Sequence, residues 1–135
     1  YPDGNGGFYL CSNYQYLGGR WSNNLGSIYH VDANGEFLCF NDMYEDYNSL
    51  QAIGMAGGVL YVKATWFPNV NEVFTQGDVS AVNDGFFTLD SDGKLTKIRS
   101  FVSGEAFLTP SGGLYCCLSW KTGLMDLRTG ELILP

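Results

Sequence analysis

The sequence predicts an all-β protein built from repeated antiparallel units. Its composition favours strands and turns, with 18 Gly, 9 Tyr and 9 Phe among 135 residues. Short apolar runs are joined by Asn-Gly, Asp-Gly and Thr-Gly turns. Such turns predict hairpins, because Gly and Asn tolerate the positive φ that a tight turn needs. The hairpin pattern occurs three times, at Ser27–Phe40, Gly85–Ile98 and Gly123–Pro135.

A second recurring element is a Gly-Gly pair followed by an aromatic-rich strand. Its copies are GGFYLCSNY (Gly6–Tyr14), GGVLYVKATW (Gly57–Trp66) and GGLYCCLSW (Gly112–Trp120). One tyrosine holds the same position in every copy: Tyr9, Tyr61 and Tyr115. These tyrosines are almost evenly spaced, which indicates internal repetition.

Each expected strand is a short apolar run bounded by Gly, Asn, Asp, Pro or Ser. In order, we expect strand Gly7–Tyr14, loop Gln15–Ser27, hairpin Ile28–Phe40, acidic loop Asn41–Ser49, strands Leu50–Met55 and Val59–Trp66, loop Phe67–Asp84, hairpin Phe86–Ile98, strands Glu105–Thr109 and Leu114–Trp120, and strands Leu124–Leu127 and Glu131–Leu134. One domain, 1–135, thus holds units at 6–40, 50–98 and 105–134. The first unit supplies only three strands, and nothing before Gly6 is expected to provide the fourth.

The segment MDLRTGELILP (Met125–Pro135) resembles the Asp-x-x-Thr-Gly hairpin of degenerate β-propeller blades, of the bacterial quinoprotein or WG-repeat kind. The resemblance implies a β-propeller-like fold of about three four-stranded blades, the first incomplete. Closed propellers carry about 4–8 blades. We therefore expect self-association or the remainder of a longer chain to complete the ring, with a different compact sheet assembly as the alternative. No cofactor or cofactor-binding residue is implied.

The charge balance excludes some partners. The net charge is −7, with only 7 Lys and Arg residues, which argues against nucleic acid or an anionic membrane as a partner. No apolar run reaches the roughly 20 residues of a transmembrane helix. The sequence does not begin with Met, so we expect a processed product or a piece of a larger protein. The composition favours an extracellular or cell-surface location.

The four cysteines predict free, buried thiols that pack as small apolar residues. This prediction favours a reducing compartment, so the localisation stays open. Cys116 and Cys117 are adjacent, and on a strand they are expected to point to opposite faces.

The long loops are expected to share one face of the repeat, and they are the candidate ligand-binding site. Their exposed aromatic, amide and charged residues suit stacking on sugar rings or gripping a peptide. The alternative is that the aromatic residues fold back over the sheets. The candidates are Tyr16, Arg20, Trp21, Tyr44, Glu45, Asp46, Tyr47, Phe67, Asn69, Asn71 and Glu72.

Other polar motifs have structural interpretations. Asp32 and Asp90 begin turns that resemble the start of a calcium loop, but both lack the acidic twelfth residue, so turn chemistry is favoured. Asp42, Glu45 and Asp46 fit either a calcium site or a glycosidase carboxylate pair, and a solvated acidic loop is favoured over both.

No nucleophile or general base stands out. His30 is the only histidine, and a place within a strand is favoured over a role as catalytic base.

Three hypotheses for function follow. The first is a non-enzymatic binding or scaffold module that presents its long loops to a glycan or protein. The second is part of a carbohydrate-active propeller enzyme, with carboxylates among Asp42, Glu45, Asp46 and Glu72. The third is a self-associating structural subunit joined through its incomplete unit.

Overall fold

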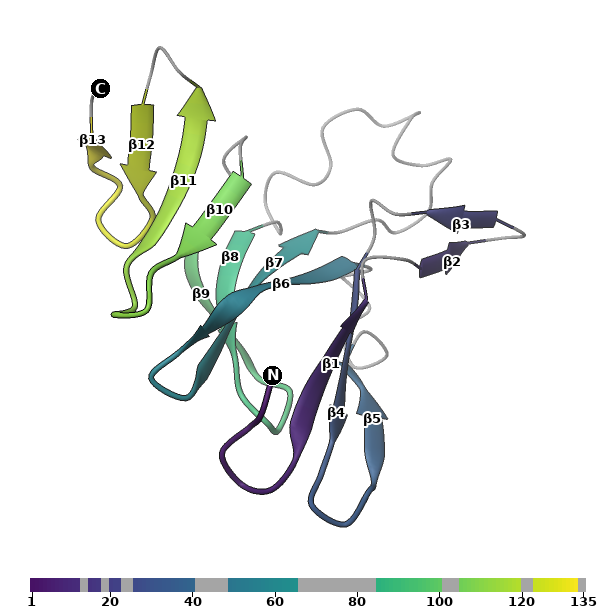
Figure 1. Ribbon diagram of the computed structural model, residues 1–135. Helices are drawn as coiled ribbons and strands as arrows, with labels where there is room; N and C mark the ends of the chain where they lie inside the picture. Colours follow the sequence, from purple (N-terminus) through teal and green to yellow (C-terminus); the bar gives the residue numbers. More distant parts are fainter. Residues whose placement is uncertain are drawn as a thin grey trace.

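The computed structural model describes residues 1–12, 15–17, 20–22, 26–40, 49–65, 85–100, 105–119 and 123–133. These residues confirm the predicted all-β class, because all their strands pair in antiparallel sheets (Figure 1). We call the three larger sheets the first, second and third sheet, in chain order. Their strands come from successive stretches of the chain, as the repeat predicts.

The first sheet has the strand order β1-β4-β5. Its strands are β1 (Phe8–Ser12), β4 (Ser27–Val31) and β5 (Phe37–Cys39). Between β1 and β4, a separate hairpin pairs β2 (Gln15–Leu17) with β3 (Arg20–Ser22). This hairpin lies in the segment Gln15–Ser27, for which the sequence predicts a loop. Its Gly-Gly between two short runs is itself a hairpin signal.

The second and third sheets are simple up-and-down meanders. The second contains β6 (Ser49–Ala56), β7 (Val59–Thr65), β8 (Gly85–Leu89) and β9 (Leu95–Ser100), in that order. The third contains β10 (Glu105–Leu108), β11 (Leu114–Ser119), β12 (Gly123–Asp126) and β13 (Leu132–Ile133). These bounds lie close to the predicted ones.

The N-terminal residues lie along the edge of β1. Pro2 forms an antiparallel bridge with Phe8, and Tyr1 exchanges two backbone hydrogen bonds with Tyr9, of 2.7 and 3.0 Å. The first sheet has three strands, as expected, and the N-terminal residues add only this isolated bridge. Pro lacks the amide that a longer strand would use.

Aspartate carboxylates organise the second tight turn of each sheet. Asp32 accepts the amides of Asn34 and Glu36 at 2.8 and 2.9 Å. Asp90 accepts the amides of Asp92 and Lys94 at 3.1 and 2.8 Å. The predicted turn chemistry of both aspartates is confirmed. In the third sheet Asp126 accepts the amides of Arg128 and Thr129. Each turn ends at a glycine with positive φ: Gly35, Gly93 and Gly130.

The second sheet is buried on both faces. One apolar cluster joins the first sheet to the second, and another joins the second to the third. The first contains Tyr9, Ile28, Phe40, Leu50, Leu60, Val62, Ala64, Phe87 and Leu89, and the second contains Tyr61, Phe86, Leu114, Cys116 and Leu127. Neighbouring residues such as Tyr61 and Val62 fall into different clusters, because successive side chains of a strand point to opposite faces.

Two glycines allow β6 to approach both neighbouring sheets. A Cβ on Gly26 would lie 2.5 Å from the carbonyl oxygen of Leu50, whose amide donates a 3.0 Å hydrogen bond to the Gly26 carbonyl. A Cβ on Gly54 would lie 3.3 Å from the side chain of Leu108 on β10. Between the second and third sheets, Arg99 adds a polar tie by donating from Nε to the Leu127 carbonyl at 2.8 Å.

The four cysteines are free thiols, but only Cys116 is buried. Cys11 and Cys117 are exposed and Cys39 is half-buried, so the prediction of buried thiols is wrong for these three. As expected, Cys116 and Cys117 point to opposite faces: Cys116 faces the second sheet, whereas Cys117 lies on the outer side of the third. Cys39 and Cys117 lie on outer faces, which no sheet covers among the described residues, so apolar character alone did not predict their burial. Cys11 lies opposite Ile28 on the inner face, and its exposure has no such explanation.

Figure 1 shows the tight turns of each sheet at the lower end of that sheet, with the β2–β3 hairpin at the other end of the first sheet. Among the described residues, no helix is long and apolar enough to cross a membrane.

Candidate functional site

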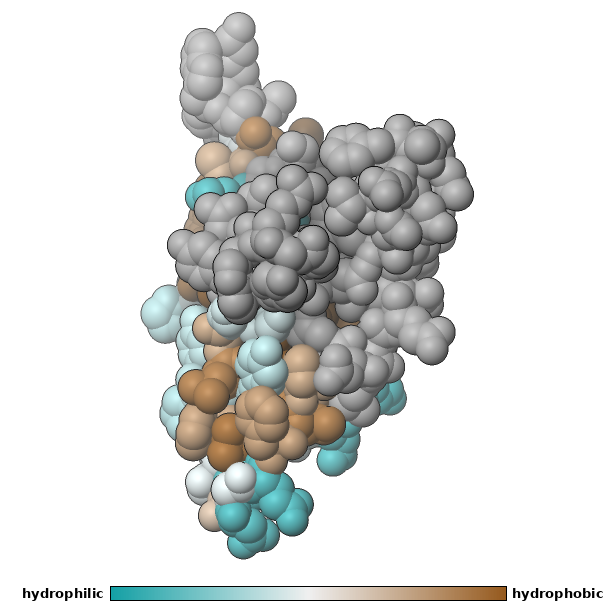
Figure 2. Space-filling model, turned by 90° about the vertical axis from the view of Figure 1, so that its right-hand side faces the viewer, coloured by the Kyte–Doolittle hydropathy of each residue, from teal (hydrophilic) through white to brown (hydrophobic). Residues whose placement is uncertain are grey.

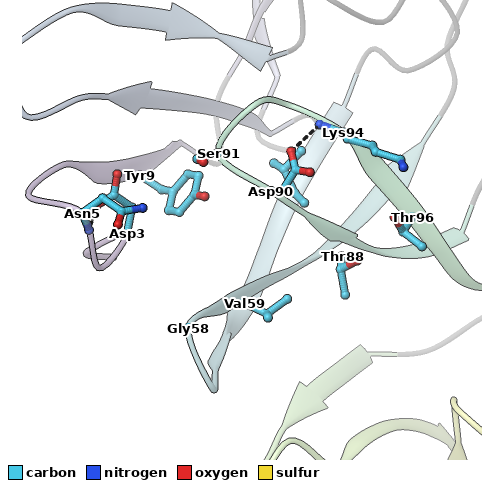
Figure 3. Close-up of a pocket in the computed structure, with 11 residues that line it drawn as sticks. Asp3, Asn5, Tyr9, Gly58, Val59, Thr88, Asp90, Ser91, Lys94 and Thr96 are labelled. Atoms are coloured by element: carbon cyan, nitrogen blue, oxygen red, sulfur yellow. Dashed lines mark hydrogen bonds between the residues drawn. The ribbon is translucent and has the colours of Figure 1, made fainter.

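A cleft of about 330 Å³ opens between the first and second sheets, beside their tight turns (Figure 3). Its lining is Asp3, Asn5, Tyr9, Gly58, Val59, Thr88, Leu89, Asp90, Ser91, Lys94 and Thr96. Three turns contribute residues to this lining: the turn before β1, the β6–β7 turn and the β8–β9 turn that begins at Asp90. They lie together because each turn is at the same end of its sheet. The repeat thus brings polar turn residues beside an aromatic ring.

Tyr9 is the aromatic residue of the cleft. Its side chain is held by neighbouring rings, with centroids 5.1 Å from His30 and 6.2 Å from Phe40. Only 5% of the residue is exposed, and its hydroxyl has no hydrogen-bond partner among the described residues. Figure 3 shows this hydroxyl directed towards the Asp90 side of the cleft. Burial raises the pKa of Tyr9, and Asp3, Asp90 and Asp92 raise it further, so the hydroxyl lies in a negative field.

Asp3 fixes the turn at one side of the cleft. Its Oδ1 accepts the amides of Asn5 and Gly7 at 2.7 and 2.9 Å, and its Oδ2 lies 2.7 Å from His30 Nε2. The hydrogen bond from His30 is the main cause that lowers the pKa of Asp3. His30 therefore sits in a strand and orders a turn, in agreement with its structural interpretation.

The corresponding place between the second and third sheets is filled by Arg128. Its Nη2 donates to the hydroxyl of Tyr61, and its guanidinium carbon lies 5.2 Å from the centroid of the Tyr61 ring. Nε and Nη2 also donate to the Gly112 carbonyl, both at 3.2 Å. A cation over an aromatic face, with a hydroxyl and a carbonyl as acceptors, stabilises this junction by about 0.5–2 kcal/mol.

The outer face of the first sheet is apolar. Side chains of the three strands alternate between the two faces, and the strand register places six apolar residues on the outer one: Phe8, Leu10, Tyr29, Val31, Phe37 and Cys39. Phe8, Leu10 and Phe37 are 42, 48 and 63% exposed. Figure 2, which views the side of the molecule where the first sheet lies, shows an apolar surface above hydrophilic residues.

The outer face of the third sheet is also mainly apolar. Phe107 and Ile133 are 43 and 46% exposed. The register places them on one face with Tyr115, Cys117 and Leu124, and the charged residues of this face are Glu105 and Asp126. Phe107 and Tyr115 stack with ring centroids 5.7 Å apart.

Of the sequence-predicted binding residues, the structure pairs Tyr16 with Trp21 across the β2–β3 hairpin. Tyr16, Arg20 and Trp21 lie on the β2–β3 hairpin, where only the backbone is described. The rest fall outside the described residues: Tyr44, Glu45, Asp46, Tyr47, Phe67, Asn69, Asn71 and Glu72, together with Asp42. Within the described ranges, no group of three or more His, Cys, Asp or Glu residues is placed to hold a metal ion.

The cleft and its filled counterpart were not among the sequence-based predictions. Arg128 is one of only 7 basic residues, and the positions equivalent to it in the other copies are acidic, Asp32 and Asp90. That difference between copies was the available signal. Asp3 was missed because the segment before Gly6 was not assigned to a unit.

No family of known proteins, no curated protein and no solved structure matches this chain.

Proposed function

We propose that the chain is a propeller-type structural module that joins a second copy of itself end to end. The outer face of the first sheet contacts the outer face of the third sheet in the other copy. The observation that carries the proposal is that both faces occupy positions which are buried elsewhere in the same molecule. Both are also apolar, as buried faces are.

Strand register defines the equivalent positions. Phe8 faces Val31 across β1 and β4, just as Leu60 faces Leu89 across β7 and β8. Leu60 and Leu114 hold the Phe8 position in the other sheets, and they are 0 and 1% exposed, against 42% for Phe8. The outer face of the first sheet therefore corresponds to the faces that receive the preceding sheet.

The same reasoning gives the outer face of the third sheet. Tyr9 points to the second sheet and Tyr61 points to the third, as their clusters show. The register places Tyr115 at the same position, on the outer face. The outer face of the third sheet therefore corresponds to the faces of the first and second sheets that pack against the following sheet. One outer face is equivalent to a face that packs on the preceding sheet, and the other to a face that packs on the following sheet. A second copy can therefore cover either of them.

The sheet arrangement supports the propeller-type geometry. The second and third sheets are up-and-down meanders, and their first strands, β6 and β10, contact each other. Closed propellers need about 4–8 blades, and two copies of three sheets fall within that range.

The test is native mass over a range of protein and salt concentrations. We expect a dimer whose population rises with ionic strength, because two chains of net charge −7 repel each other and salt screens that repulsion. Phe37→Asp on the first sheet and Phe107→Asp on the third should each give monomers. A 1:1 mixture of the two variants should restore a dimer, because the mixture still contains one intact pair of faces.

The matched control is Leu38→Asp. Leu38 is 43% exposed and neighbours Phe37 on β5, but its register with His30 places it on the other face. This variant should dimerise like the unmodified chain. A monomer at every concentration, or a Phe37→Asp variant that still dimerises, would contradict end-to-end association.

The binding of a glycan or protein by the long loops stays a prediction. So does the carbohydrate-active alternative, because the carboxylates it requires lie outside the described residues.

A further inference from the structure

We propose that the cleft between the first and second sheets binds a guanidinium group, the side chain of an arginine from a partner protein. The inference does not depend on end-to-end association. It starts from the two equivalent places in the repeat, of which one is filled by Arg128 and the other is open.

The equivalence follows from strand register. Tyr9 faces His30, Tyr61 faces Thr88 and Tyr115 faces Asp126. The residues two positions beyond Thr88 and Asp126 are Asp90 and Arg128. Arg128 therefore stands in the third sheet where Asp90 stands in the second.

The acceptors of Arg128 also have counterparts. It contacts the ring and hydroxyl of Tyr61, and the carbonyl of Gly112, three residues before Tyr115. In the open cleft the corresponding residues are Tyr9 and Gly58, and both line it. Gly58 and Gly112 share a positive φ, of 77° and 93°, so their turns follow similar paths. The open cleft thus has the aromatic ring, the hydroxyl and the glycine turn that Arg128 contacts in the filled place. Where the filled place has Arg128, the open cleft has the carboxylate of Asp90.

The hydroxyl of Tyr9 has no hydrogen-bond partner among the described residues, which points to a ligand. The residue is 95% buried, since its exposure is 5%, and a buried polar group that stays unsatisfied is costly. A guanidinium satisfies this hydroxyl as Arg128 satisfies Tyr61. The volume of about 330 Å³ is within the range of small-molecule sites.

The carboxylates of the cleft favour a positively charged ligand. Asp3 and Asp90 line it, and Lys94 is the basic residue of the lining. The Lys94 side chain is exposed, and Figure 3 shows its ammonium directed away from Tyr9. A planar guanidinium stacks on a tyrosine ring and donates several hydrogen bonds in one plane, which a compact ammonium does not. We therefore expect arginine to be preferred over lysine.

The test is a titration of the full chain with methylguanidinium chloride at constant ionic strength, followed by amide chemical shifts. We expect saturable shifts at the cleft with one site per chain, and roughly tenfold weaker binding of methylammonium. Tyr9→Phe removes the hydroxyl and should weaken binding by about fivefold to tenfold. Tyr61→Phe is the matched control and should leave binding at the open cleft unchanged.

A second variant turns the filled place into a site. Arg128→Ala vacates the ring of Tyr61, so we expect two methylguanidinium sites per chain, with new shifts around Gly112. Absence of saturable shifts, equal binding by Tyr9→Phe, or a single site in Arg128→Ala would overturn the proposal.

Binding of short peptides tests whether the guanidinium group comes from a protein side chain. A blocked Gly-Arg-Gly peptide that binds at least as tightly as methylguanidinium, and more tightly than Gly-Lys-Gly, supports a protein side chain. Exclusion of the peptide while methylguanidinium binds would contradict that source.

Discussion

The Asp3 carboxylate and the His30 imidazole meet at 2.7 Å, which ties the N-terminal turn to the central strand of the first sheet. The contact joins residues 27 positions apart in the sequence. It holds the turn that orders Tyr1 and Pro2 on the sheet edge, and it places Asp3 at the cleft.

The first prediction concerns the pH dependence of this contact. The pKa of Asp3 is lowered from its ordinary value of 3.8, first by the hydrogen bond from His30 and then by backbone amides. A carboxyl whose pKa is lower in the folded state stabilises that state above the unfolded pKa, and this stabilisation is lost as the pH falls through the folded pKa. Asp3→Asn should therefore lower the melting temperature at pH 6, and the difference from the unmodified chain should shrink below about pH 4.

The control for this experiment is Glu36→Gln, which makes the same change in net charge at an exposed turn residue. A difference between Asp3→Asn and the unmodified chain that stays constant down to pH 2 would show that the carboxylate charge does not act through this contact.

The second prediction concerns thiol reactivity. Burial raises the pKa of the Cys116 thiol, and the residue is 0% exposed. Because the thiolate is the reactive form, Cys116 should resist alkylation until the protein unfolds. Its neighbour Cys117, on the outer face, should react within minutes in dilute protein. Peptide mapping by mass spectrometry measures both. Rapid labelling of Cys116 in the folded protein would mean that the second and third sheets do not pack as described.

Thiol labelling also tests the proposed end-to-end association. Cys117 lies on the third-sheet face that we propose is covered in the dimer, so its labelling should slow as protein concentration rises. Phe107→Asp should abolish that slowing.

The third prediction separates two reasons for glycine. Gly26→Ala should destabilise the protein by about 1–3 kcal/mol, because the new Cβ meets a backbone oxygen that cannot move alone. Gly35→Ala should also destabilise it, by about 1–2 kcal/mol, because its φ of 81° disfavours a side chain although the space around it is open. Asn tolerates that φ, so Gly35→Asn should recover much of the loss. Gly26→Asn should not. Urea unfolding gives both values, and recovery at both positions would refute the steric explanation for Gly26.

The fourth prediction concerns local stability. The second sheet is covered on both faces and its strands β7 and β8 are internal, so their amides should exchange with solvent most slowly. Amides of β5 and β13, at sheet edges, should exchange fastest among the strand residues. Native-state hydrogen exchange checks the order, and equal protection of β5 and β8 would contradict it.

Local patterns predicted much of the fold. Hairpins at Asn34-Gly35, Asp92-Gly93 and Thr129-Gly130 were predictable because a tight turn depends on neighbouring residues only. The repeat itself was readable from Tyr9, Tyr61 and Tyr115, because the same position carries the same ring.

The long-range features were not predictable in the same way. The pairing of Tyr1 with Tyr9 depends on backbone groups that carry no side-chain pattern, and the cleft depends on how two sheets stack. Tyr9 and Tyr61 looked alike in sequence. What distinguishes their surroundings is a residue in a different strand pair, Asp90 in one case and Arg128 in the other.

The uniform direction of Tyr9, Tyr61 and Tyr115 along the stack has a consequence for how such a chain can lengthen. Each unit has one face towards the preceding sheet and one towards the following sheet, and it contacts only its neighbours. Duplication of one unit's coding segment would therefore insert an extra layer without rebuilding any existing junction, and the number of layers is free to change by whole units.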